Sequence, residues 1–212
     1  MEGMCNDNQI YKRKKLKKRN IKINRFKYKI MFLTLLIIIL LIYFSSNLMN
    51  DKNYNYKLGK KIYTSMNDKQ NRTKAYVSAV YLNGGYSENT CVYFLAEVLR
   101  MSGEKIDVSV CNTAKILDIM KRDGWKIERN YKKLKPGDIC FTTDELLNKN
   151  GTPTHTYIFM GWKKEGNYDY AYICDNQAKD YNGKIYHLRN ITKAEKMGKN
   201  VKEPFSFFMY KK

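Results

Sequence analysis

Cys91 is the residue in this sequence whose type and position most clearly suggest chemistry, because it opens an amphipathic helical pattern. The apolar residues after it recur at helical spacing, at Phe94, Leu95, Val98 and Leu99. Gly103 is a typical helix stop. The unpaired N–H groups and the positive end of a helix favour a thiolate over a thiol. We therefore predict that Cys91 is a nucleophile.

A cysteine nucleophile needs a base that holds the ion pair and protonates the leaving group, and imidazole suits this task. The chain has two histidines. His155 begins a strand-like run directly after residues 151–154, where a side chain can face a cleft. His187 lies in an ordinary alternating segment over 184–189. We predict His155 as the base. A hydrogen-bonded structural role is the alternative for both histidines, and we favour it for His187.

A third polar group must orient the base through its other ring nitrogen. Residues 170–174 should pair with the strand after His155 as a hairpin, and Asp175 and Asn176 stand at its end. Alternation along a strand puts these two side chains on opposite faces. We prefer Asp175 and keep Asn176 as the alternative, while a turn role is open for either.

A hydrolase of this kind also needs donors for the oxyanion that forms during acyl transfer. The backbone N–H of Cys91 is one expected donor. Tyr86 or Asn89 is a candidate for the second, although both also suit the turn before the helix.

The elements that must position these residues change type along the chain. Helices are expected first, over 74–82, from Cys91 to Gly103 and over 113–122 with Asn112 or Thr113 as its cap. Short strand-like runs follow, at 125–127, 138–141, 156–160, 170–174 and 205–209. Helices followed by strands predict an α+β domain with a small antiparallel sheet over 74–212.

The sequence before this domain predicts a membrane anchor. The first 29 residues hold eleven Lys and Arg against Glu2 and Asp7, and residues 30–49 carry no charge. About 20 apolar residues cross a bilayer core. A cleavable signal peptide is the alternative, but the run ends without an A-x-A site. The positive-inside rule then predicts a cytoplasmic tail at 1–29, a transmembrane helix at 30–49, and an outward-facing remainder. Residues 50–73 are polar and are interpreted as a stalk or loose lead-in.

The formal charge of +20 implies an anionic neighbour. Roughly half of the excess lies in the tail, where fixing topology explains it without nucleic acid, which we do not expect as a partner. The basic outer part suits peptidoglycan or another anionic wall polymer, or anionic lipid.

The remaining outer cysteines, Cys111, Cys140 and Cys174, are expected to be small buried residues, although with Cys91 they could also form two disulfides. They contain no C-x-x-C pair, so we predict no metal site.

The order of these features resembles the papain-like cell-wall hydrolases of the NlpC and CHAP types. It consists of a cysteine at a helix start, the phrase Leu134-Lys135-Pro136-Gly137-Asp138, a histidine opening a strand and a polar residue closing the next. The resemblance covers roughly residues 75–178. It implies a papain-like fold in which the phrase introduces the first sheet strand. It also implies hydrolysis of peptidoglycan amide bonds, as an amidase or endopeptidase, by Cys91, His155 and Asp175, without a metal or an organic cofactor.

Three other functions remain open. A transglutaminase-like acyltransferase uses the same residue types. A non-catalytic module that binds a wall polymer would keep the fold and leave the thiol idle. A membrane-tethered regulator would act through its basic tail.

Overall fold

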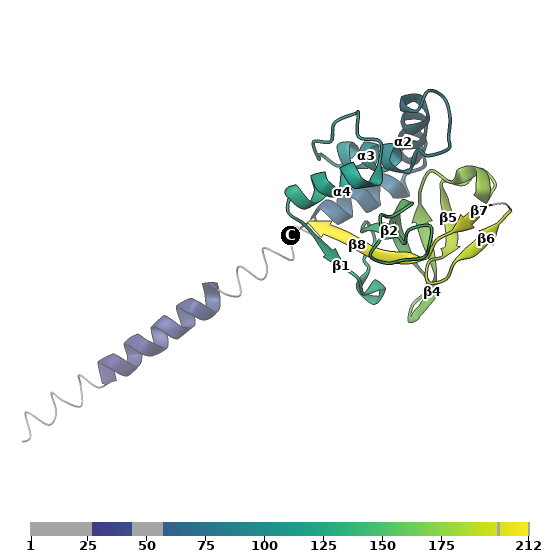
Figure 1. The fold of residues 1–212 in the computed structure, drawn as a ribbon. Coiled ribbons are helices and arrows are strands. Elements are labelled where there is room, and N and C mark those ends of the chain that lie inside the picture. The colour runs from purple at the N-terminus through teal and green to yellow at the C-terminus, as the bar shows by residue number, and fades with distance from the viewer. Residues whose placement is uncertain (1–26, 44–56, 199, 212) are drawn as a thin grey trace, which may run out of the picture. The chain divides into compact units, whose positions relative to one another are not determined.

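A computed structural model describes residues 27–43, 57–198 and 200–211. The chain divides into two compact units, residues 1–50 and 51–212. The second unit is an α+β domain in which helices cover one face of an antiparallel sheet (Figure 1). The predicted fold class is therefore confirmed at this level.

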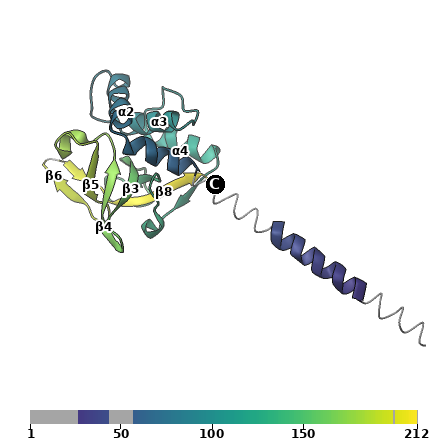
Figure 2. The same cartoon turned by 180° about the vertical axis from the view of Figure 1, so that it is seen from behind.

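The main sheet has six antiparallel strands in the order β1-β8-β2-β3-β4-β5. Their bounds are Trp125–Glu128 for β1, Ile139–Thr142 for β2, Thr156–Lys164 for β3, Asn167–Cys174 for β4, Tyr186–Asn190 for β5 and Phe205–Lys211 for β8. The hairpin β3–β4 is present as predicted, with Ile158 opposite Cys174. The sequence did not indicate the small hairpin of β6, Glu195–Met197, and β7, Asn200–Lys202. Seen from behind, β4, β5 and β6 follow one another at one side of the domain (Figure 2).

Three labelled helices, α2 (Lys69–Leu82), α3 (Cys91–Met101) and α4 (Thr113–Arg122), lie on one face of this sheet. The bounds of α4 match the prediction, and its expected cap Asn112 accepts a hydrogen bond from the N–H of Lys115 at 2.8 Å. Helix α3 begins at Cys91 and ends before Gly103, whose φ of +99° suits glycine. Two 3-10 turns complete the domain, at Tyr131–Lys133 (η1) and Ala178–Tyr181 (η2).

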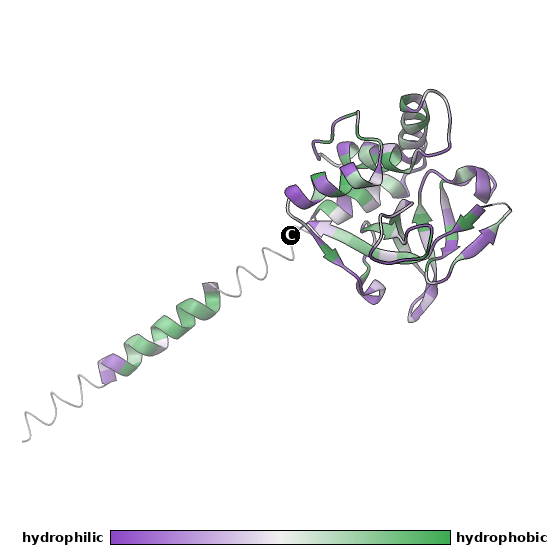
Figure 3. Cartoon of the chain, in the orientation of Figure 1, coloured by the Kyte–Doolittle hydropathy of each residue, from purple (hydrophilic) through white to green (hydrophobic). Residues whose placement is uncertain are grey.

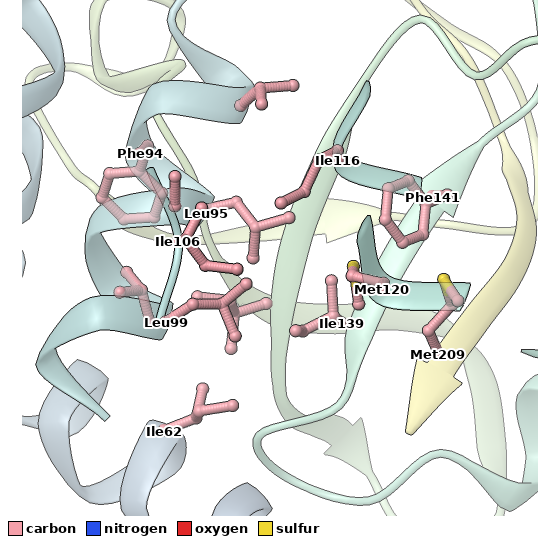
Figure 4. Close-up of a cluster of buried hydrophobic side chains, with 14 of the residues drawn as sticks. Ile62, Phe94, Leu95, Leu99, Ile106, Ile116, Met120, Ile139, Phe141 and Met209 are labelled. Atoms are coloured by element: carbon pink, nitrogen blue, oxygen red, sulfur yellow. The ribbon is translucent and has the colours of Figure 1, made fainter. Parts of the chain in front are cut away.

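The main core lies between the helices and the sheet. Figure 4 shows side chains of α3 and α4, such as Leu95 and Met120, facing strand side chains such as Ile139. A second, smaller core covers the opposite face of the sheet and includes Tyr157 and Ile173. Both faces are covered at the start of β3 and at the end of β4, so polar side chains next to these strand ends are also buried.

The interpretation of residues 50–73 as a stalk is wrong for the part that the structure describes, which begins at residue 57. Residues 57–67 are helical, and α2 follows almost directly. Leu58, Ile62 and Met66 recur every four residues and are buried in the main core, where Figure 4 shows Ile62. These three apolar residues form one stripe along the helix, and the sheet and the other helices provide the surface that buries this stripe.

The first unit is described only for residues 27–43, which are helical. The helix is mostly apolar (Figure 3), and its side chains are exposed in the structure. Within the described residues, no helix is both long and apolar enough to span a membrane. Residues 44–49 of the predicted transmembrane helix, and most of the basic tail at 1–29, lie outside the described part of the chain.

Candidate active site

Cys91 is the first residue of α3, as predicted. The preceding residue Thr90 is the N-cap and is fully buried. Its side chain makes no cap bond to the helix; its hydroxyl instead donates to the carbonyl of Ser87 at 2.8 Å. The N–H groups of the first turn of α3 therefore have no side-chain acceptor from Thr90, and the positive end of the helix faces the sulfur.

His155 lies directly before β3 and is held through its backbone by the end of β2. Its N–H donates to the hydroxyl of Thr142 at 3.0 Å, and its carbonyl accepts from the N–H of Thr142 at 3.1 Å. The side chain is only 5% exposed. The backbone of His155, the predicted base, is thus held by hydrogen bonds to the end of β2.

The ring of His155 interacts with both Asp175 and Cys91. Its Nε2 lies 2.9 Å from Oδ2 of Asp175, which leaves Nδ1 as the nitrogen that can serve the sulfur. Burial acts to lower the pKa of His155, but the hydrogen bonds to Asp175 and to Cys91 outweigh it and raise that pKa. The geometry therefore favours an imidazolium next to the Cys91 sulfur.

Asp175 follows β4 and is completely buried. Burial alone would raise its pKa, but the hydrogen bond from His155 and the charges of His155 and Arg189 lower the pKa to about 2. Its second oxygen, Oδ1, accepts from the N–H of Gln177 at 2.9 Å. Asp175 is therefore an ionised group with a fixed orientation, as an orienting residue requires.

Asn176, the alternative orienting residue, has another role in the structure. Its Nδ2 donates to Thr90 Oγ1 at 2.9 Å and to the carbonyl of Ser87 at 3.4 Å. Neighbouring residues at a strand end point to opposite faces, so Asn176 turns toward α3 when Asp175 turns toward His155. The alternative assignment of Asn176 as the partner of His155 is therefore wrong.

Cys91 and His155 line one open cleft of about 560 Å³. One wall comes from the turn before α3, and the other comes from η2 and β7. Among the two oxyanion candidates, Asn89 lines this cleft, with a φ of +56°. Tyr86 is 70% exposed and does not line it. Of the two side chains, only Asn89 is therefore placed to reach a substrate in the cleft.

Two buried residues behind Asp175 were not predicted as part of the site. Nε2 of His187 lies 3.8 Å from Oδ1 of Asp175, and its Nδ1 lies 3.0 Å from the carbonyl of Lys184. His187 also stacks on Tyr181, with ring centroids 3.5 Å apart. Burial lowers the pKa of His187 and favours its neutral form.

Arg189 is the second of these residues and is 1% exposed. One guanidinium nitrogen donates to the carbonyl of Glu203 at 2.6 Å, and the group lies over the ring of Tyr157 at 5.6 Å. Its charge helps to lower the pKa of Asp175. The alternation of residues 187 and 189 on one strand is visible in the sequence, but arginine is rarely buried, so no sequence pattern indicated that this face turns inward.

The other outer cysteines lie away from this cleft. Cys140 and Cys174 are buried, as expected, whereas Cys111 is exposed, which corrects the prediction that it is buried. All four described cysteines are free thiols. Cys111 follows the loop before α4 and faces Tyr93 instead of the core. Within the described ranges, no three His, Cys, Asp or Glu side chains form a set that could hold a metal ion.

No protein-family model, curated protein or solved structure matches this chain. The assignment of a function therefore depends on the residues and geometry of the cleft.

Proposed function

We propose that this chain is a membrane-anchored, outward-facing cysteine hydrolase of the papain-like type that cleaves amide bonds in peptidoglycan. The observation that carries the proposal is the arrangement of Cys91, His155 and Asp175. The sulfur lies at the start of α3, the imidazole ring directly before β3, and the buried carboxylate directly after β4. The anchor is residues 30–49, with the tail at 1–29 inside the cell.

The chemistry follows from the positions of these groups. The sulfur of Cys91 attacks the carbonyl carbon of the amide and forms a C–S bond. The oxyanion that develops accepts a hydrogen bond from the N–H of Cys91. The His155 imidazolium then gives its proton to the departing nitrogen, and the C–N bond breaks.

The second half of the reaction regenerates the sulfur. The neutral His155 takes a proton from a water molecule, whose oxygen forms a bond to the thioester carbon. The C–S bond then breaks, which frees the Cys91 sulfur and releases a carboxylic acid. Asp175 holds the ring in place during both proton transfers and favours its charged form. The cycle needs water as its only co-reactant.

Peptidoglycan is the proposed substrate because three features favour an extracellular wall polymer. The cleft is open, and its volume of about 560 Å³ suits a segment of a polymer. The order of Cys91, the phrase at 134–138 and His155 resembles the NlpC and CHAP types. The basic tail and the uncharged run at 30–49 are typical of an anchor that leaves the domain outside.

The direct test is digestion of purified peptidoglycan by the full-length chain in a neutral detergent. We expect soluble fragments with new amino and carboxyl ends, and mass analysis of these fragments identifies the bond. Cys91→Ala and His155→Ala should release none, whereas Cys111→Ser, which removes an exposed thiol elsewhere, should keep full activity.

Other outcomes would replace the proposal. Fragments joined to an added amine, without free carboxyl ends, would make the protein an acyltransferase. Equal digestion by Cys91→Ala and the parent would show that the cleft sulfur is not the nucleophile. Binding of the wall without any release would indicate a non-catalytic module.

A further inference from the structure

A second hollow lies on the other side of the segment that leads to His155. It has a volume of about 300 Å³ and lies among α4, the end of β1 and the loop at 149–153. Its floor includes the apolar side chains of Leu117, Ile127 and Phe207, and its rim carries Lys121, Arg129 and Lys149. We call this hollow the basic groove.

The basic groove and the catalytic cleft have opposite charge. The basic groove has three cationic side chains and a single carboxylate, Asp118. The cleft instead has four carboxylates and two lysines; these are Glu88, Glu145, Asp180, Glu203, Lys179 and Lys202. The chain has a formal charge of +20, yet its cleft is acidic. The cleft and the basic groove therefore attract ligand groups of opposite charge.

Two of the cleft carboxylates are already paired with its lysines. Glu88 lies 3.0 Å from Lys179, and Asp180 pairs with the buried Lys202. Glu145 and Glu203 have no ion pair among the residues that the structure describes. An anionic segment of a polymer is therefore repelled from the cleft, whereas the three cations of the basic groove attract it.

The fold holds the Arg129 side chain and the backbone of Lys149 in place. Nη1 of Arg129 donates to the carbonyl of Lys149 at 2.9 Å, and its guanidinium lies 5.7 Å from the ring centroid of Phe207. Ser206 donates to the same carbonyl at 2.7 Å. Because the backbone of Lys149 is fixed by two donors, Arg129 and Lys149 stay on the same rim.

The loop that carries Lys149 is also tightly packed. Asp144 accepts hydrogen bonds from the N–H groups of Leu146 and Asn148, at 3.0 and 2.7 Å. A Cβ at Gly151 would lie 1.9 Å from the carboxylate of Asp144, so the loop needs glycine there. The same loop continues into Thr154 and His155, which line the catalytic cleft. A ligand in the basic groove is thus held a few residues from the base.

We propose that the basic groove binds a phosphodiester-linked wall polymer and holds it beside the catalytic cleft. This inference rests on the proposed function and adds the anionic part of its substrate. An arginine fork and two lysines around one hollow suit successive phosphates, each of which carries a charge. A single carboxylate would use one of the three cations, whereas a repeating phosphodiester reaches all of them. The apolar floor accommodates the carbon backbone between phosphates.

The test measures binding to insoluble wall by the full-length chain in a neutral detergent. All variants carry Cys91→Ala, so that cleavage does not affect the measurement. The groove variant adds Lys121→Gln, Arg129→Gln and Lys149→Gln. The matched control removes three exposed lysines outside both hollows, by Lys105→Gln, Lys163→Gln and Lys164→Gln. Wall with the phosphodiester polymer and wall stripped of it are compared.

We expect the groove variant to bind intact wall about tenfold more weakly than the parent, because it loses three exposed charge contacts. The matched control should stay within about twofold. Removal of the polymer from the wall should weaken the parent to the level of the groove variant. The parent's affinity should also fall as salt increases.

Two results would overturn the proposal. Equal weakening by the groove and control variants would mean that net charge alone attracts the wall. Equal binding of the parent to intact and stripped wall would exclude the phosphodiester as the ligand. A second variant, Lys121→Glu with Lys149→Glu, keeps Arg129 and its bond to the loop, so it gives a result even if the triple variant is unstable. Because Cys91→Ala is present throughout, these results are independent of whether the parent protein cleaves peptidoglycan.

Discussion

Asn176 and Thr90 are joined by a hydrogen bond of 2.9 Å from the amide of one to the hydroxyl of the other. They are far apart in the sequence, yet Asn176 directly follows the carboxylate that orients His155, and Thr90 directly precedes Cys91. The pair therefore connects the strand end that controls the base to the helix start that carries the sulfur. Together with the second bond of Asn176, to the carbonyl of Ser87, and the packing of α3 in the main core, this contact helps to set the spacing between base and nucleophile.

The Asn176→Ala variant tests this connection. Loss of a buried hydrogen bond should lower the free energy of unfolding by about 1–2 kcal/mol and leave the Thr90 hydroxyl without its donor. Activity should fall further than stability explains, because the sulfur is no longer held opposite the ring. Denaturant unfolding and wall digestion measure the two effects. Unchanged activity in a destabilised Asn176→Ala protein would show that the contact has only a structural role.

The pH dependence of Cys91 labelling tests the role of Asp175. Because Asp175 and Cys91 together raise the pKa of His155, we expect an alkylating reagent to label Cys91 rapidly even near pH 6, where ordinary thiols react slowly. Asp175→Asn removes the orienting charge, so labelling at that pH and wall digestion should both fall, the latter by about 10²–10⁴-fold. Asp169→Asn, an exposed change on the same strand, should alter neither rate. A Cys91 that labels no faster than the exposed Cys111 at any pH would contradict the assignment.

Arg189 is expected to act on the base through Asp175. Arg189→Met keeps most of the side-chain length and removes the charge that helps to lower the pKa of Asp175. Because the pKa of Asp175 should then rise, we expect the lowest pH at which Cys91 still labels fast to be higher in this variant. In a protein that already carries Asp175→Asn, the same change should have little further effect, since its target is gone. A double-mutant cycle on labelling rates measures this coupling, and strictly additive effects would assign Arg189 to packing alone.

The buried carboxyl group of Asp138 should make the stability of the protein depend on pH. Burial raises its pKa to about 7, and the N–H of Lys135, 2.8 Å away, offsets this only in part. The folded protein therefore keeps the proton to a higher pH than the unfolded chain, whose aspartates ionise near 3.8. The resulting stability is fully present below about pH 3.8 and is lost as the pH rises through about 7.

Asp138→Asn should remove this dependence, because asparagine stays neutral and still accepts from Lys135. Relative to the parent, the variant should gain stability as the pH rises from about 4 to 8. Denaturant titrations followed by the fluorescence of Trp125 and Trp162 give the free energies at each pH. A parent and a variant whose stabilities change in parallel over this range would indicate that Asp138 is ionised throughout.

Ile62 tests whether residues 57–67 belong to the domain. Its side chain is 1% exposed in the main core, so Ile62→Ala should lower the free energy of unfolding by about 2–4 kcal/mol. Lys61→Ala, at an exposed neighbouring position, should change it by less than about 0.5 kcal/mol. Thermal or denaturant unfolding distinguishes the two. Equal stability of Ile62→Ala and the parent would restore the interpretation of this segment as a stalk.

Several features could be predicted because they are local. The bounds of α4, the start of α3 at Cys91 and the β3–β4 hairpin follow from residue spacing, caps and turn residues along one stretch of chain. Local alternation also placed Asp175 and Asn176 on opposite faces, because a strand sends neighbouring side chains to opposite sides, but only the tertiary structure put Asp175 on the side of His155. The chemical roles of these residues remain predictions that the experiments above address.

Other features depended on which surfaces meet. The sequence by itself determined an α+β chain with a cysteine at a helix start and a histidine at a strand start. Only the tertiary structure placed His187 and Arg189 behind Asp175, because β5 pairs with β4 and brings its alternate residues to the same buried face. Only packing made residues 57–67 part of the core, since their stripe of three apolar side chains becomes a buried face only against an existing sheet. The opposite charges of the cleft and the basic groove likewise come from residues of distant segments, whose distances no sequence pattern specifies.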